Sequence, residues 1–77
     1  MSIGLDELTS GNTAEIIALE QSGSIASRLA ALGFVPGRQV SMVQNFGRGP
    51  LIVSVINTRV ALGRREAAGI HIRRHLS

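Results

Sequence analysis

A chain of 77 residues that is 44% hydrophobic and 17% charged has room for one globular domain, residues 1–77, and lacks the composition of a disordered segment. It contains no cysteine, which excludes disulfides and favours a reducing, cytoplasmic compartment. The formal net charge is +3 and every basic residue is an arginine, so charge alone allows an acidic protein surface or a nucleic acid as partner. No stretch approaches the roughly 20 apolar residues of a membrane span.

The first third of the chain alternates short apolar runs with turn-forming residues. Residues 3–8 are expected to form a turn that docks on the core, and residues 13–19 (TAEIIAL) are rich in β-branched side chains and predict a strand. Ser24 then stands where a helix N-cap is expected. In the helix that follows, three positions at i, i+4 and i+7 are expected to face the core: Ile25, Leu29 and Leu32.

The helix is predicted to end in a rigid corner, RLAALGFVPG at residues 28–37. Gly33 stands where a left-handed C′ residue is favoured, so its φ is expected to be positive. Phe34 is placed to fold back on the last helical turn, as in a Schellman motif. The segment VPGR that follows has proline second and glycine third, which is the pattern of a type II turn.

The rest of the chain predicts four more strands and one helical turn. The strands are expected at residues 39–46, 51–56, 59–62 and 70–73, with breaks at residues 47–50 and 57–58 and the helical turn within residues 63–69. Phe46 is expected to end its strand with a core-facing side chain. Together these elements predict a mainly β fold: a small, partly open barrel of about five strands, with one α-helix between the first two strands and a short helical turn before the last.

The residues that could carry chemistry do not form a catalytic or metal-binding pattern. His71 and His75 are four residues apart, but a strand here would separate them by about 13 Å. The carboxylates are not spaced as ligands of one metal ion, and no serine or threonine has an identifiable base partner. The sequence therefore predicts no metal site, no cofactor and no enzymatic activity.

Single-stranded nucleic-acid binding is the alternative function that a small barrel leaves open. Such surfaces combine a basic groove with aromatic side chains that stack on bases. This chain has two aromatic residues, Phe34 and Phe46, and both are expected to serve the fold. At roughly 1–3 kcal/mol per stacked base, too little stacking remains for tight binding. A module that binds a protein partner is therefore favoured.

Three segments resemble, in order and spacing, the motifs of FeoA proteins, the small cytosolic components of bacterial ferrous-iron uptake. RLAALGFVPG is similar to R-L-x-x-L-G-[apolar]-x-P-G, FGRGPLIVSV to G-D-P before an apolar strand, and RVALGRREAAGIHI to A-L-x-x-x-x-A-x-x-I-x-[apolar]. The similarity spans roughly residues 13–72. One departure is Gly49, preceded by Arg48, where the family often has aspartate before the proline.

The resemblance implies an SH3-like barrel that binds and modulates the membrane transporter FeoB, so that the chain would be cytoplasmic and membrane-associated through its partner. It implies an accessory protein rather than an enzyme. The corner and the glycine-proline loop are expected to hold side chains rigidly for this contact. The candidate contact residues are Phe34, Val35, Pro36, Arg48, Gly49 and Pro50. The direction of the effect on transport, and whether the chain forms a weak homo-oligomer, stay open.

Overall fold

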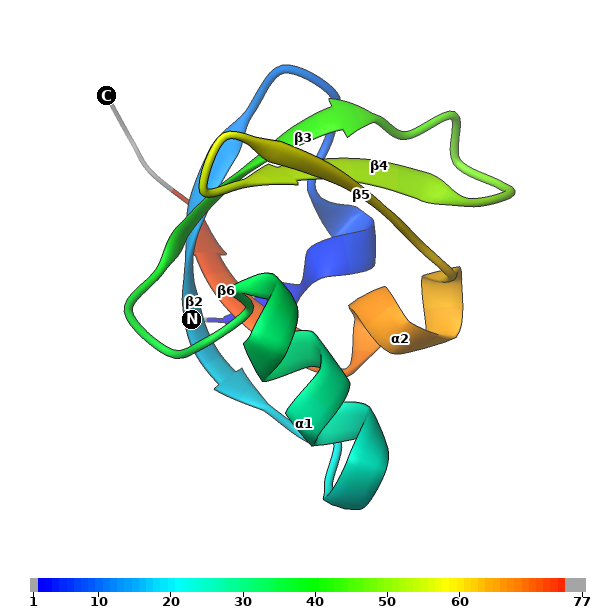
Figure 1. Cartoon of the computed structure of the whole chain (residues 1–77). Coiled ribbons are helices and arrows are strands. Elements are labelled where there is room, and N and C mark those ends of the chain that lie inside the picture. Colours follow the sequence, from blue (N-terminus) through cyan, green and yellow to red (C-terminus); the bar gives the residue numbers. More distant parts are fainter. Residues whose placement is uncertain (1, 75–77) are drawn as a thin grey trace.

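The computed structural model describes residues 2–74, which form one antiparallel sheet that curls around a hydrophobic core (Figure 1). The six strands lie in the order β1-β6-β2-β3-β4-β5. In chain order the elements are β1 (Ile3–Gly4), the 3-10 helix η1 (Leu5–Glu7), β2 (Thr13–Leu19), α1 (Gly23–Leu32), β3 (Gln39–Gln44), β4 (Leu51–Val55), β5 (Thr58–Leu62), α2 (Arg64–Ala68) and β6 (Ile70–Arg74). The expected mainly β, partly open barrel is confirmed, with α1 between its first two long strands and α2 before the last.

The strands have the alternating pattern of a sheet with one buried face. In β4 every second side chain is buried, beginning with Leu51, and the residues between them, Ile52 and Ser54, face outward. β3 alternates in the same way, with Val40 and Met42 inward. Among the described residues the core contains no polar or charged side chain. The outward face of β3, β4 and β5 is therefore free to serve a purpose other than folding.

The N-terminal segment closes one end of the barrel. Residues 3–8 dock on the core as expected, because η1 places Leu5 and Leu8 at 0% exposure. The segment also contributes β1, in which Ile3 is opposite Ile72 of β6. The sheet consequently has six strands rather than five. A two-residue strand has no sequence pattern of its own and forms because β6 offers it an edge.

Helix α1 begins two residues earlier than expected, and only one of its residues is buried in the core. The N-cap position belongs to Ser22 rather than Ser24, and no side-chain hydrogen bond caps the helix there. Leu29 is fully buried, as predicted. Ile25 and Leu32 are 49% and 36% exposed, so the prediction that all three face the core is wrong for these two. The helix lies across the barrel and only its middle reaches the core.

The end of β3 also differs from the sequence-based expectation. The pairing of β3 with β4 shifts register between Met42 and Gln44, and the strand ends at Gln44. Phe46 lies beyond that point and is 75% exposed, so the expected core-facing role is wrong.

Among residues 2–74, no helix has the length and apolar character needed to cross a bilayer.

Candidate interaction surfaces

The corner after α1 has the predicted Schellman geometry. Gly33 has φ +108°, in the left-handed region. Its N–H donates to the carbonyl of Ala30 at 3.0 Å, and the N–H of Phe34 donates to the carbonyl of Leu29 at 2.9 Å. These two bonds satisfy carbonyls that the end of a helix otherwise leaves unpaired. The chain direction after α1 is thus fixed by local hydrogen bonds.

The type II turn that follows is also confirmed. The N–H of Arg38 donates to the carbonyl of Val35 at 3.1 Å, and Gly37 has φ +89°. The turn is tied to β2, because the N–H of Gly37 donates to the carbonyl of Ile16 at 2.8 Å. Pro36 is exposed and Val35 is half-buried at this corner.

Phe34 has a different role from its neighbours in the corner. Its side chain is 0% exposed and belongs to the core cluster. It therefore supports the corner from beneath and presents nothing to a partner. Val35 and Pro36 are the accessible residues of this corner.

The β4–β5 turn packs against the same corner. Its two central residues are Ile56 and Asn57, with φ +49° and +59°, and Val55 is opposite Thr58. This is the type I′ geometry that suits a two-residue hairpin, one residue earlier than the expected break. A Cβ atom on Gly33 would lie only 2.8 Å from Cδ1 of Ile56, so the turn closes over the helix end.

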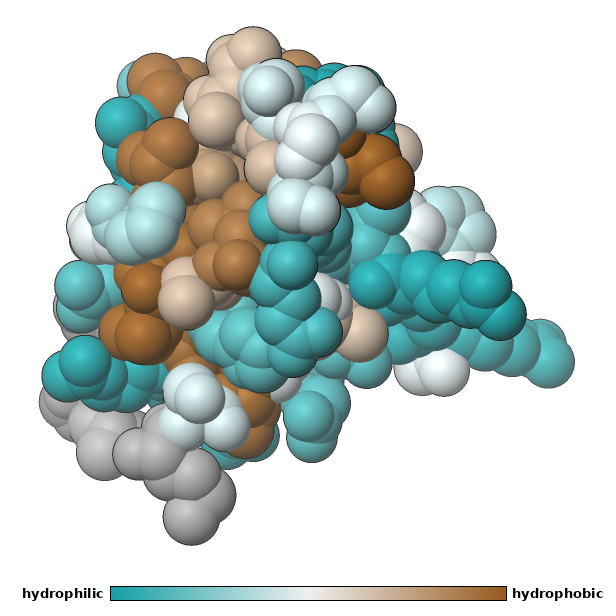
Figure 2. Space-filling view, turned by 90° about the horizontal axis from the view of Figure 1, so that it is seen from below, coloured by the Kyte–Doolittle hydropathy of each residue, from teal (hydrophilic) through white to brown (hydrophobic). Residues whose placement is uncertain are grey.

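An apolar surface surrounds this contact. Ile56 packs against Gly33 and is still 58% exposed. Leu32, the residue before Gly33, is exposed beside it. Ile25 lies two helical turns before Leu32 on α1. We call these three residues, Ile25, Leu32 and Ile56, the α1-side apolar surface. Figure 2, which views the molecule from the α1 side, shows hydrophobic side chains gathered over the middle of this face. Ile56 could not be predicted to lie on this surface, because isoleucine is disfavoured at positive φ and nothing local predicts the turn there.

The β3–β4 loop is held by the side chain of Asn45. Its Nδ2 donates to the carbonyls of Asp6 and Leu8 at 3.0 and 2.8 Å, and its Oδ1 accepts from the N–H of Gly47 at 2.9 Å. The same Oδ1 accepts from Nη2 of Arg64 at 2.5 Å. This asparagine therefore fixes the base of the loop to the N-terminal segment and to α2.

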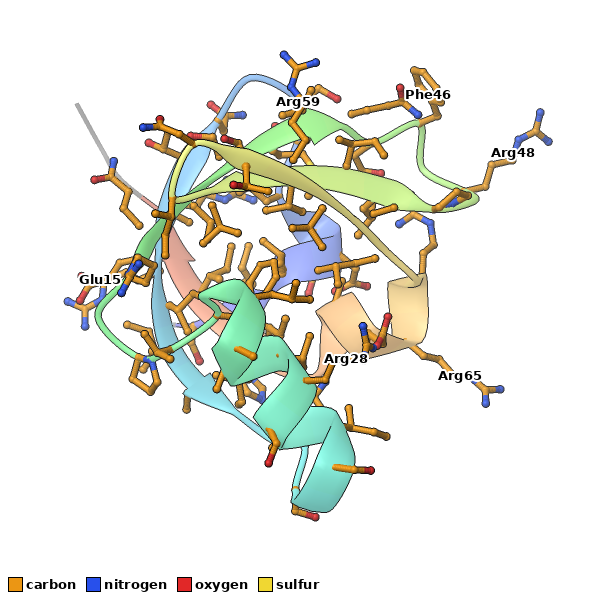
Figure 3. The ribbon with its side chains drawn as sticks, in the orientation of Figure 1. Glu15, Arg28, Phe46, Arg48, Arg59 and Arg65 are labelled. Atoms are coloured by element: carbon orange, nitrogen blue, oxygen red, sulfur yellow. The ribbon has the colours of Figure 1, made fainter. Side chains whose placement is uncertain are left out.

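The tip of this loop carries the other candidate residues. Arg48, Gly49 and Pro50 are all exposed, and Gly49 has φ +75°. Figure 3 shows Arg48 pointing away from the barrel. The loop tip and the helix-end corner lie on opposite sides of the molecule (Figure 1), so the structure does not bring the two groups of candidate residues together.

Positive and negative charges are segregated along the chain. No aspartate or glutamate occurs between Gln21 and Arg65. Within residues 2–74 Arg28 forms an ion pair with Glu66, and Glu20 contacts His71. This leaves the arginines of the β3–β5 region without a carboxylate partner: Arg38, Arg48 and Arg59. This side of the molecule can therefore attract an anionic partner.

The structure also places one of the two histidines. Nε2 of His71 lies 2.5 Å from Oε2 of Glu20, across the β2–β6 pair. His75 lies outside the described residues. Within residues 2–74, no three side chains of the histidine, cysteine, aspartate and glutamate types come close enough together to hold a metal ion. Glu20 and His71 are two ligand types in contact, and a protein metal site needs more.

These features define a small β-barrel domain whose exposed corners are fixed by local hydrogen bonds. The FeoA domain model matches residues 3–74, and the chain belongs to the FeoA family. The family is associated with ferrous-iron transport and has an SH3-like fold.

Three similar proteins illustrate this relationship. The chain is 33% identical over 69 residues to a Porphyromonas gingivalis fusion of Fe(2+) transport protein A with the Fe(2+) transporter FeoB; the match covers 88% of this chain and 8% of that protein. It is 36% identical to Stenotrophomonas maltophilia FeoA complexed with zinc, a prokaryotic SH3 domain protein, with TM-score 0.83 and coverage of 92% and 89%. A crystal structure of an iron uptake regulatory protein (FeoA) has the same fold, with TM-score 0.90, 24% identity and coverage of 97% and 100%.

Proposed function

We propose that this chain is a non-enzymatic accessory protein of ferrous-iron uptake that binds and modulates a FeoB-type transporter on its cytoplasmic side. The observation that carries the proposal is the P. gingivalis relative, in which a similar domain is covalently joined to FeoB. Covalent fusion keeps two domains at high effective concentration, which is useful when the separate domains act as a complex. The proposed location is the cytoplasm, with the chain held near the membrane by its partner.

We place the contact at the two preordered parts of the surface. The helix-end corner offers Val35 and Pro36 beside the α1-side apolar surface, and the loop tip offers Arg48, Gly49 and Pro50. Residues already fixed by hydrogen bonds lose little conformational entropy on binding, which favours such surfaces as contacts. The chain corresponds to 8% of the length of the fusion relative, so a partner of that size is large enough to contact opposite sides of this domain.

The loop tip gives the sharper test. Arg48 is the only large side chain between Gly47 and Pro50, and we assign it to an acidic patch of the transporter. Arg48→Glu is expected to weaken binding by roughly tenfold or more, because like charges at an interface oppose association. Its effect on stability is expected to stay below about 0.5 kcal/mol, since the residue is exposed. The measurement is a titration against the detergent-solubilised transporter, with thermal melts alongside.

Arg65→Glu provides the matched control, because Arg65 is an exposed arginine on α2 and undergoes the same change of charge. We expect this control to bind the transporter nearly as tightly as the wild type. Equal weakening by the two substitutions would indicate a general charge effect and remove the loop tip from the contact. Failure of the wild-type chain to bind would refute the proposed function itself.

A salt series distinguishes the alternative, a nucleic-acid-binding barrel. Affinity that depends on phosphate contacts falls steeply as salt rises, whereas apolar contacts at the corner do not weaken in this way. Tight, salt-sensitive binding of single-stranded oligonucleotides, with no binding to the transporter, would favour the alternative.

A further inference from the structure

The outward face of β3, β4 and β5 carries positive charge, hydroxyl groups and one highly exposed aromatic side chain at its edge. We propose that this face, with Phe46, binds the surface of an anionic phospholipid bilayer. The proposal concerns lipid and goes beyond the proposed transporter contact; either one can fail without the other.

The polar part of this face is organised across the strands. Ser41 of β3 is opposite Ser54 of β4, and Ser54 is in turn opposite Arg59 of β5. The two serines also line a shallow, open groove of about 370 Å³, whose lining residues are Arg38, Gln39, Ser41, Ser54, Ile56 and Asn57. A guanidinium, two hydroxyls and two amides are donors that suit a phosphate oxygen. The groove can therefore take a lipid headgroup.

Phe46 adds the apolar part of the surface. It is 75% exposed, the highest value among the large hydrophobic residues of the described chain. The hydrogen bond from the N–H of Gly47 to Oδ1 of Asn45 spans Phe46 and holds it at the apex of the bend. Figure 3 shows Phe46 and Arg59 directed away from the barrel on the side of β3, β4 and β5. The aromatic ring is thus presented by a fixed loop, on the same side of the barrel as Arg59.

This combination fits a bilayer better than the other anionic partners. Anionic leaflets attract arginines, and a headgroup region accepts an inserted aromatic ring at the same time. Stable membrane association generally requires two such signals together. An acidic protein surface would account for the arginines and leave Phe46 unexplained. Single-stranded nucleic acid calls for several stacking rings, and Phe46 is the one exposed aromatic residue in residues 2–74.

Intrinsic fluorescence provides a direct test, because the chain has no tryptophan or tyrosine. The Phe46→Trp variant is titrated with vesicles of phosphatidylglycerol mixed with phosphatidylcholine, and separately with vesicles of phosphatidylcholine alone. We expect a blue shift and a rise in emission with the anionic vesicles only. Ile25→Trp is the control reporter, since Ile25 is 49% exposed and belongs to α1. Figure 3 shows α1 at the opposite end of the molecule from Phe46. The emission of the control reporter is expected not to change.

The charge requirement is tested on the Phe46→Trp background. Arg59→Gln is expected to weaken vesicle binding by roughly fivefold, the contribution of one arginine near an anionic surface. Arg65→Gln removes an exposed arginine from α2 and is expected to weaken binding less than about twofold. The proposal is overturned by the absence of a shift at position 46, by an equal shift at position 25, or by equal effects of the two arginine substitutions. A shift caused by an oligothymidine strand but not by vesicles would assign the face to nucleic acid instead.

Discussion

Gly33 and Ile56 both have left-handed backbone conformations, and the two residues occupy adjacent space. Ile56 has φ +49°, a conformation that costs a β-branched residue about 1–2 kcal/mol. The type I′ turn of the β4–β5 hairpin requires it, and the side chain then lies over Gly33. Because Gly33 has no Cβ, it adopts the left-handed conformation that ends the helix and also leaves room for the side chain of Ile56.

Replacing Gly33 by alanine tests this arrangement. Alanine at this position would have to adopt the positive φ of Gly33, which is strained for a non-glycine residue. Its Cβ would also lie 2.8 Å from Cδ1 of Ile56 and 3.1 Å from Cγ2 of Val55. Gly11→Ala is the matched control, because Gly11 has φ +87° and nothing within 4 Å of its Cβ position. Both variants should lose about 1–2 kcal/mol from backbone strain. Thermal melts should show a larger loss for Gly33→Ala; equal losses would mean that Ile56 and Val55 move aside without cost.

Helix α1 depends on a single fully buried residue. Leu29 is the one buried residue of its ten, and it is part of the Schellman motif that fixes the helix end. The backbone carbonyl of Leu29 accepts the hydrogen bond from the N–H of Phe34, so the residue whose side chain packs in the core also belongs to the helix cap. Packing and capping thus meet at the same turn of the helix.

Truncation of Leu29 should therefore be costly. Leu29→Ala is expected to lower the free energy of unfolding by about 2–5 kcal/mol, as for other buried leucines. Ile25→Ala, on the same helix but 49% exposed, should cost much less. Urea denaturation of both variants measures the difference. Similar losses would show that the side chain of Leu29 is not the main contact of α1 with the core.

At the scale of the whole molecule, acidic and basic groups belong to different parts of the barrel. The acidic residues belong to the first twenty residues and to α2, while the β3–β5 side carries only arginines. Two metal-ligand types meet in the Glu20–His71 pair, where Glu20 directly follows β2 and His71 belongs to β6. In residues 2–74 no third ligand joins them.

We therefore expect no specific metal binding. Calorimetric titration with ferrous iron or zinc at micromolar concentration should show no saturable heat, because two ligands do not complete a site. The S. maltophilia relative crystallised in complex with zinc, so the zinc titration is the more stringent test of this prediction. A stoichiometric signal in the wild type that disappears in His71→Ala would contradict the prediction.

The sequence by itself determined the features that depend on residues close together in the chain. The corner at residues 28–37 was predictable because the hydrogen bonds that define its helix cap and its turn join residues no more than five positions apart, and glycine and proline restrict the backbone there. The long strands, the short α2 and membership of the FeoA family followed from local patterns and motif order.

Only the tertiary structure decided which of these features are exposed and where they lie. Phe46 points outward because Asn45 bonds to carbonyls more than thirty positions earlier in the chain. Ile56 became part of the surface because its turn packs on Gly33, and the two groups of candidate contact residues lie on opposite sides. No local pattern in the sequence predicts these contacts, because each one forms only when folding brings together residues that are far apart in the sequence.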